Sequence, residues 1–379
     1  MRLNTLILLM ITLCLGSFWG CTTDEDGVRP GVDGDADSDS DGDGDADGDS
    51  DSDSDSDGDA VGFVGDHGRL QVSGSDIVDG HGDPIQVKGL SWYWSMWQGD
   101  WFRADVVDAI VEDFNVTVVR APLGILSTDK TAGYILMNED DRAKHLAMVE
   151  TVVDAAIDNG IYVIIDWHDH WANEHEAEAI EFFHHMGQRY GNAQNIIWEI
   201  WNEPDYGEEW SVIKAYGDAV IPVIRQYSDN LILVGSSNYS YSIIDPVTSD
   251  APFTQDNIAY SFHFYVENNS HSLNIAQAYV DAVREEGLPV FVSEWGLEVS
   301  NTDSYVNSGS FMTADVDDAK VGPWMDWMDE KGLSWVFWSV SSATESSAMF
   351  NSSAKDSVGN WSYDDDLRPA GQYIYDYFN

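Results

Sequence analysis

The sequence is poor in basic residues and in cysteine. Its 379 residues include 17 lysines and arginines against 68 aspartates and glutamates, and the formal net charge at pH 7 is −51. Nucleic acids and anionic membrane surfaces would repel such a chain, so neutral soluble molecules and uncharged polymers remain as its natural partners. The two cysteines are Cys14 and Cys21. If the chain is cut before Cys21, that residue has no disulfide partner, and disulfides do not hold the fold together.

The apolar run at the start lacks the length of a comfortable transmembrane helix. Residues 1–21 contain an early arginine and a stretch rich in Leu, Ile and Met, and a strongly acidic segment follows at once. This pattern predicts an export signal. Cys21 after Gly20 resembles a bacterial lipoprotein attachment site, although Phe18 and Trp19 replace the usual aliphatic and small residues. We expect a lipid anchor at Cys21, with simple secretion as the alternative, and so a location outside a bacterial cell or on its outer surface.

Aromatic residues are absent from residues 24–60, which are nearly all Asp, Ser, Gly and Ala. Such a segment cannot bury enough apolar surface to fold alone, so we predict a disordered acidic linker over residues 22–65. Its 17 acidic residues and one arginine give −16, so most of the negative charge belongs to the remainder. The alternating aspartates also resemble calcium-binding repeats. They lack the hydrophobic residues and the bidentate glutamate of a folded calcium loop, which favours a self-repelling tether.

Apolar runs and helix-like stretches alternate along residues 66–379, where we predict a single domain. Eight runs have the composition of buried strands: Val87–Leu90, Thr117–Arg120, Ile161–Asp166, Ile196–Ile200, Leu231–Val234, Ile258–His263, Val290–Ser293 and Ser334–Trp338. Five stretches have helical spacing of apolar residues: Arg103–Phe114, Asp141–Asn159, Ala177–Tyr190, Leu273–Glu286 and Asp315–Lys331. The alternation predicts βα units and a parallel sheet. Before the first strand, the alternating apolar residues of Leu70–Val87 predict a hairpin.

Two of the predicted strands end on glutamates. The run from Ile196 stops at Asn202 and Glu203, and Pro204 directly afterwards cannot continue a sheet ladder. The run from Val290 meets Glu294 in the same way. A carboxyl group at such a place is half buried, and burial raises the pKa of a carboxyl group, as a general acid near neutral pH requires. Two such glutamates are the parts of a glycosidase, whereas the structural alternative is that they cap strands or pair with arginine.

The two motifs, Asn-Glu-Pro at 202–204 and Ser-Glu-Trp-Gly at 293–296, resemble the signatures of glycoside hydrolase family 5, in the cellulase superfamily. They occur in the family's order and about ninety residues apart, and the resemblance covers roughly residues 68–379. It implies an α/β fold, a (β/α)8 TIM barrel with an N-terminal β-hairpin plugging the barrel bottom. The catalytic domain would then be residues 66–379.

The resemblance also implies roles for residues at the strand ends. Glu203 would protonate the glycosidic oxygen and later activate water, and Glu294 would attack the anomeric carbon with retention of configuration. Arg120 and Tyr265 match the family residues that hydrogen-bond the nucleophile. An alternative for Arg120 is a purely structural ion pair.

Further matches describe how the sugar would be bound. Asn202 matches the residue that binds the 2-hydroxyl, and His168 and His263 match active-site histidines. Trp97 and Trp338 match aromatic platforms for the sugars on the non-reducing side of the cut, where axial C–H faces stack on indole. In the family a cis peptide bond follows the residue matched to Trp338.

The chain also departs from the family pattern. Tyr93 stands where the family's cellulases often carry a histidine, and it can still donate one hydrogen bond. Ala343 stands where a lysine usually binds the second sugar's hydroxyl, while the nearby glutamate is present as Glu345. We therefore expect weaker polar recognition of that sugar and a greater reliance on stacking at Trp97.

Clustered histidines raise the alternative of a metal site. His168, His170, His175, His184 and His185 lie close in sequence, but no His-Glu-x-x-His pattern occurs, so we predict neither metal nor cofactor. The predicted function is that of a retaining endo-β-1,4-glucanase, a monomer acting on cellulose or a related β-glucan. The alternatives are a β-mannanase or mixed-linkage glucanase on the same barrel, and a non-catalytic sugar-binding surface lipoprotein.

Overall fold

The structure, a computed structural model, describes residues 62–266, 268, 270–297 and 316–379. The predicted export signal, Cys21 and nearly all of the predicted linker lie outside the described residues. Within the described part, the helices are too short or too polar for any of them to cross a membrane.

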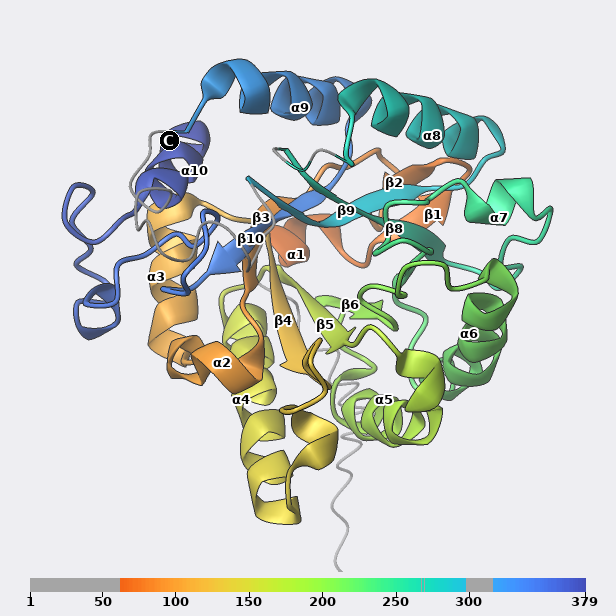
Figure 1. The fold of residues 1–379 in the computed structure, drawn as a ribbon, viewed down its shortest axis with the longest axis horizontal. Coiled ribbons are helices and arrows are strands. Elements are labelled where there is room, and N and C mark those ends of the chain that lie inside the picture. Colours follow the sequence, from red (N-terminus) through yellow and green to blue (C-terminus); the bar gives the residue numbers. More distant parts are fainter. Residues whose placement is uncertain (1–61, 267, 269, 298–315) are drawn as a thin grey trace, which may run out of the picture. The chain divides into compact units, whose positions relative to one another are not determined.

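Eight parallel strands close into a barrel in which each strand pairs with the next along the chain and the last pairs with the first (Figure 1). They are β3 (Lys88–Trp92), β4 (Val118–Gly124), β5 (Tyr162–His168), β6 (Ile196–Glu199), β7 (Ile232–Val234), β8 (Ile258–Tyr265), β9 (Val290–Gly296) and β10 (Trp335–Val340). All eight predicted strands are confirmed. The TIM barrel predicted from the alternation and the resemblance is therefore the observed fold.

Helices surround the barrel and connect its strands (Figure 1). Those in the described residues are α1 (Gly62–His67), α2 (Ser95–Gln98), α3 (Ala104–Phe114), α4 (Glu139–Asp158), α5 (Glu176–Tyr190), α6 (Trp210–Ile224), α7 (Asp245–Thr248), α8 (Leu273–Glu285), α9 (Asp318–Lys331) and α10 (Pro369–Phe378). Short 3₁₀ turns span Gly99–Trp101, Tyr134–Leu136, Ala172–Glu174 and Ala354–Asp356. The five predicted helices correspond to α3, α4, α5, α8 and α9.

Helix α6 escaped prediction because its sequence contains two residues that normally interrupt helices. Pro222 lies in its last turn, and Gly217 lies on its buried face. A Cβ atom at Gly217 would come within 2.5 Å of the Phe253 ring, so only glycine allows this close approach. Tertiary packing thus outweighs the low helix propensity of both residues.

An antiparallel hairpin of β1 (Gln71–Ser73) and β2 (Asp76–Val78) packs against the N-terminal ends of the barrel strands. Leu70, just before β1, and Ile77 of β2 join a buried cluster with barrel residues such as Val118, as a plug requires, although the two strands are shorter than the predicted span Leu70–Val87. Val64 of α1 is fully buried in the same cluster. The folded part therefore includes residues 62–65, and the predicted linker boundary at residue 65 is wrong by these four residues.

Candidate active site

The inward-facing side chains change from apolar to polar along five of the barrel strands, β4, β5, β6, β8 and β9. The buried cluster at the barrel bottom includes Val118, Ile164, Ile197, Ala259 and Phe291. Two residues further along the same strands stand Arg120, Asp166, Glu199, Ser261 and Ser293, all fully buried. Because successive side chains of a strand point to opposite faces, this spacing of two places the polar layer directly above the apolar one. The hairpin closes one end of the barrel, and the polar layer supports a site at the other.

Arg120 is the centre of the polar layer. Its Nε donates to Glu199 (2.7 Å), its Nη1 donates to Glu294 (2.9 Å), and its Nη2 contacts Asp166 (2.9 Å) and donates to the side-chain oxygen of Asn202 (2.5 Å). Burial alone would lower the pKa of Arg120, but the three carboxylates raise it, so the guanidinium stays charged. The structure contains both contacts expected for Arg120. The hydrogen bond to Glu294 is the one that the resemblance implies, and the pairs with Glu199 and Asp166 are structural ion pairs.

Glu294, in β9, is buried and has a donor on each carboxylate oxygen. Arg120 donates to Oε2, and the Tyr265 hydroxyl donates to Oε1 at 2.7 Å. Burial and the charge of nearby Glu203 raise the pKa of Glu294, while His263, Arg120 and Tyr265 oppose this rise by stabilising the carboxylate. The side chain is thus oriented and hydrogen-bonded as an attacking carboxylate needs to be.

Glu203 follows β6 and faces two histidines. Its Oε1 lies 3.0 Å from Nδ1 of His263, and its Oε2 lies 3.8 Å from Nδ1 of His170. Burial raises the pKa of Glu203, as the sequence predicts, but the hydrogen bond and charge of His263 outweigh burial and lower it. The expectation of a raised pKa is therefore wrong for the free protein, because a histidine from another strand lies against the carboxylate.

His263 joins Glu203 to the polar layer. Its Nε2 lies 2.9 Å from the hydroxyl of Ser293, which donates to Glu199. Burial lowers the pKa of His263, but Glu199 and Glu203 raise it to about 9. Although burial also raises the pKa of Glu199, Arg120 and His263 lower it to about 2. The ionised Glu199 therefore holds a positive charge on His263.

Glu203 and Glu294 lie close together across the barrel mouth. One side-chain oxygen of each, and one ring nitrogen of His263, all lie within 4.8 Å of one another. Carboxyl groups about 5 Å apart characterise retaining glycosidases. A metal ion could also fit three such groups, but the donors Arg120 and Tyr265 already engage both oxygens of Glu294, which suits a free carboxylate. Of the clustered histidines, His168 and His170 lie in the site, whereas the other three have different partners: His184 contacts Tyr227, His185 contacts Glu150 and His175 contacts Asp169.

Comparison with known proteins shows the family of this chain. Residues 78–344 match the family model for cellulase, glycosyl hydrolase family 5. The chain belongs to glycosyl hydrolase family 5. It is 38% identical over 299 residues to endoglucanase A of Evansella cellulosilytica, covering 77% of this chain and 56% of that protein. Endoglucanase Z of Dickeya dadantii is 35% identical over 291 residues, covering 76% of this chain and 63% of that protein. The chain thus spans less than two thirds of the length of these curated relatives.

Solved structures show the same barrel. A structure from Cytophaga hutchinsonii superposes with a TM-score of 0.72 at 31% identity, covering 83% of this chain and 95% of that one. The catalytic domain of endoglucanase Cel5A from Thermobifida fusca gives a TM-score of 0.69 at 30% identity, covering 83% of this chain and 98% of that one.

The predicted sugar platforms of this family 5 domain differ in exposure. Trp97, in α2, is 50% exposed and free to stack on a sugar. Trp338 is almost buried, and its indole stacks on the His168 ring at 5.4 Å and 7°. The peptide bond after Trp338 is cis, as the resemblance implies. Tyr93 lies 5.0 Å from the Trp338 ring, and burial, then the charges of Glu345 and Glu294, raise its pKa, so its hydroxyl keeps its proton.

Glu345 is buried near the site on the loop that follows β10. Burial and the charge of Glu294 raise its pKa to about 8. Arg368, before α10, donates to the backbone oxygens of Ala343 (2.6 Å) and Ser342 (3.1 Å). Arg368 thus anchors the loop after β10 to the segment that precedes α10. The sequence did not predict this contact.

Sequence reasoning also missed the functional importance of Asp166 and Glu199. Asp166 Oδ2 accepts a hydrogen bond from Nδ1 of His168 at 2.7 Å, and burial lowers the pKa of His168, which favours a neutral ring with its proton on Nδ1. Glu199 holds Arg120 and His263. The sequence contained a signal for both residues. Asp166 lies two residues after Ile164 and Glu199 two residues after Ile197, and both isoleucines face the barrel interior.

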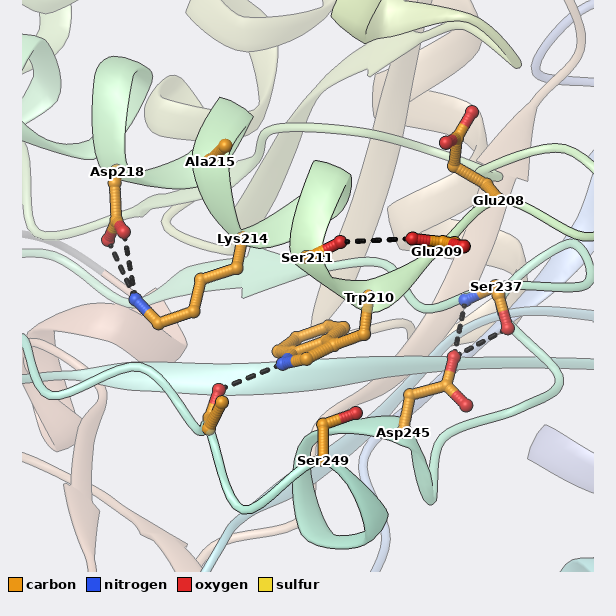
Figure 2. A pocket seen from close by; sticks show the side chains of 11 residues that line it. Glu208, Glu209, Trp210, Ser211, Lys214, Ala215, Asp218, Ser237, Asp245 and Ser249 are labelled. Carbon is orange, nitrogen blue, oxygen red and sulfur yellow. Dashed lines mark hydrogen bonds and ion pairs between the residues drawn. The ribbon is translucent and has the colours of Figure 1, made fainter. Parts of the chain in front are cut away.

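A separate surface hollow of about 690 Å³ lies beside α6 and α7 (Figure 2). Figure 2 shows Lys214 paired with Asp218 and Ser237 bonded to Asp245 along its lining. The predicted site residues are not among those that line it. Because none of the predicted site residues lines this hollow, we place the candidate active site at the strand ends instead.

Proposed function

We propose that this protein is a retaining endo-β-1,4-glucanase that hydrolyses cellulose or a related β-glucan. The observation that carries the proposal is the approach of Glu203 and Glu294 within 4.8 Å, with donors on the second and a histidine on the first. Membership of family 5 supports a glycosidase reaction, and the endoglucanase names of the relatives support the substrate.

The first step forms a covalent intermediate. Ionised Glu294 attacks the anomeric carbon, the bond from that carbon to the glycosidic oxygen breaks, and its electron pair goes to the oxygen. Glu203 gives its proton to that oxygen, so the leaving sugar departs as an alcohol. His263 donates to Oε1 of Glu203, which leaves Oε2 to face the glycosidic oxygen. Bound sugar excludes water from Glu203, and this loss of solvation favours the protonated acid that the step needs.

The second step releases the sugar, returns Glu294 to a carboxylate and returns Glu203 to its protonated form. Glu203, now ionised, takes a proton from water as the water oxygen bonds to the anomeric carbon. The bond between that carbon and Glu294 breaks, and its electron pair returns to the carboxylate, where Arg120 and Tyr265 stabilise it.

Asn202 is placed to hold the reacting sugar. Its side-chain oxygen accepts from Arg120, which fixes the amide orientation. Its Nδ2 is buried without a hydrogen-bond partner among the described residues. A buried amide donor is costly to leave unpaired, so a sugar 2-hydroxyl beside Glu294 is the natural acceptor. Trp97 and Trp338 would stack on sugars of the non-reducing side, with Tyr93 and Glu345 as polar contacts.

Release of reducing sugar from carboxymethylcellulose, lichenan and mannan tests the proposal. We expect the highest activity on carboxymethylcellulose or lichenan. Preference for mannan would identify a β-mannanase, and a strong preference for lichenan would identify a mixed-linkage glucanase. Binding without product from any of the three would identify a sugar-binding lipoprotein.

We also propose that the chain is exported and anchored by lipid at Cys21, and that it acts as a monomer. The sequence of the leader supports the anchor. Cys21→Ser should move the protein from the detergent phase to the aqueous phase on partitioning, because that cysteine is the proposed attachment point. Aqueous partitioning of the unchanged protein would instead indicate secretion.

A further inference from the structure

His170 lies beside Glu203 without contacting it closely. It follows β5 in the loop, is 6% exposed, and its Nδ1 has no hydrogen-bond partner among the described residues. That nitrogen lies 3.8 Å from Oε2 of Glu203, which is too long for a hydrogen bond. A buried polar atom without a partner is unfavourable. Nδ1 of His170 would therefore be stabilised in any state of the protein in which it gains a hydrogen-bond partner.

Aromatic neighbours hold the His170 ring in place. The rings of Trp94, Trp171 and Tyr239 have their centroids 5.6 Å, 5.6 Å and 5.7 Å from it. The loop is also tied to the Glu203 loop by two backbone hydrogen bonds of 3.2 Å, from Glu203 to Asp169 and from Asp205 to His170. The two loops are therefore held together on both sides of the 3.8 Å separation between Nδ1 of His170 and Oε2 of Glu203. A small shift of either side chain brings these two atoms to hydrogen-bonding distance.

The two oxygens of Glu203 have different surroundings. Oε1 is engaged by His263, so Oε2 is the oxygen that exchanges protons with the glycosidic oxygen and with water. Oε2 gains negative charge when the first step ends, at which point a donor nearby becomes valuable. A neutral histidine with its hydrogen on Nδ1 suffices, and no change in the charge of His170 is needed.

We propose that His170 is a positioning residue for Glu203. In the glycosyl-enzyme, where Glu203 is ionised, His170 donates a hydrogen bond from Nδ1 to Oε2 of Glu203 and so stabilises the base of the second step. This inference rests on the proposed retaining mechanism. The other titratable or charged groups that act on Glu203 or His170 come from the surrounding strands and the loops after them, namely Arg120, His168, Asp205, Tyr239, His263, Tyr265, His271 and Glu294. In the glycosyl-enzyme Glu294 is an ester without charge, which leaves Glu203 mainly under the influence of the two histidines.

The test compares His170→Leu with His170→Asn, two side chains of similar shape of which only asparagine carries a donor near the position of Nδ1. The substrate is 2,4-dinitrophenyl β-cellobioside, whose leaving group departs without an acid, so the second step limits kcat. We expect the acid limb of the kcat profile to move to higher pH by about one unit in the leucine variant, with kcat below that limb about tenfold lower. Its plateau at higher pH should change little, and the asparagine variant should keep the unaltered limb.

A burst of dinitrophenolate confirms that the second step limits the rate, and thermal melting checks the fold. His170→Ala repeats the test if leucine does not fit the aromatic surroundings. A loss of kcat that is equal at every pH, or equal in the leucine and asparagine variants, would mean that His170 only fills space, and an unchanged profile in the leucine variant would also overturn the inference. Failure of the unaltered protein to hydrolyse the cellobioside would overturn the proposed function itself, and the inference with it.

Discussion

Arg120 donates a 2.9 Å hydrogen bond from Nη1 to Oε2 of Glu294, and the guanidinium that does so is completely buried. The same guanidinium pairs with Glu199 and Asp166. One cation thus compensates three carboxylates in the barrel interior, and the proposed nucleophile is one of them. We therefore expect both the stability of the fold and the proposed catalysis to depend on Arg120, so that one substitution should change both.

Glutamine substitutions should separate the roles of the two glutamates. Glu203→Gln should still form the glycosyl-enzyme from 2,4-dinitrophenyl β-cellobioside, because that leaving group needs no acid. Glu294→Gln should lose turnover by several orders of magnitude on every substrate. Mass spectrometry of the trapped intermediate and steady-state rates measure both. Equal and complete loss in the two variants would contradict the assignment.

Arg120→Met should destabilise the fold strongly. The substitution leaves Asp166, Glu199 and Glu294 buried without their cation, and breaking a buried ion pair costs about 3–5 kcal/mol. Arg120→Lys is the control, since it retains the charge but not the planar fork, and it should lose less. Denaturant unfolding gives both values. A methionine variant as stable as the unaltered protein would show that the network does not stabilise the fold.

Glu345 should make the protein less stable as pH rises. Its folded-state pKa is raised to about 8, so between its ordinary value near 4.5 and 8 the folded protein binds more protons than the unfolded chain. Stability therefore falls as pH rises through that window. Glu345→Gln, which stays neutral, should gain at least about 1 kcal/mol relative to the unaltered protein between pH 5 and pH 8. A difference that does not change with pH would mean that Glu345 ionises normally.

Ala343→Lys should strengthen recognition of the second sugar. A charge-assisted hydrogen bond contributes roughly 1.5–3 kcal/mol, so cellotriose should bind more tightly and cellulose should be preferred more strongly over mixed-linkage glucan. Trp97→Ala should weaken binding more than Glu345→Ala, because the half-exposed indole provides the stacking surface. Calorimetry measures all three variants. No change in the lysine variant would place Ala343 outside the cleft.

Truncation should distinguish the acidic linker from the fold. Removing residues 1–60 should leave the melting temperature and specific activity unchanged, with or without calcium. Removing residues 1–67 should cost roughly 1.5–3 kcal/mol, because Val64 of α1 leaves the buried cluster. A drop in melting temperature on the shorter truncation that appears only with calcium would support calcium-binding repeats instead.

The amino-acid sequence by itself determined the barrel and the pair of glutamates. A strand that is buried on both faces requires a continuous apolar run, and parallel strands require a connecting segment, usually a helix, between them. The apolar runs and most of the connecting helices can therefore be recognised in a single sequence. The end of each run then marks the barrel mouth, which is why Glu203 and Glu294 could be identified together. The sequence did not predict the short α7 or helix α6, which contains Pro222 and also Gly217, whose close approach to Phe253 local sequence does not reveal.

Only the tertiary structure decided the electrostatics of the site. The lowered pKa of Glu203 depends on His263 from β8, and the ionisation of Glu199 depends on Arg120 from β4. The position of His170 depends on the contact between two loops. These effects arise from charges a few ångströms apart in space but 60 to 80 residues apart in sequence, as the pairs His263–Glu203 and Arg120–Glu199 illustrate. Coulombic interactions follow distance in space, and the closed barrel brings those strands together.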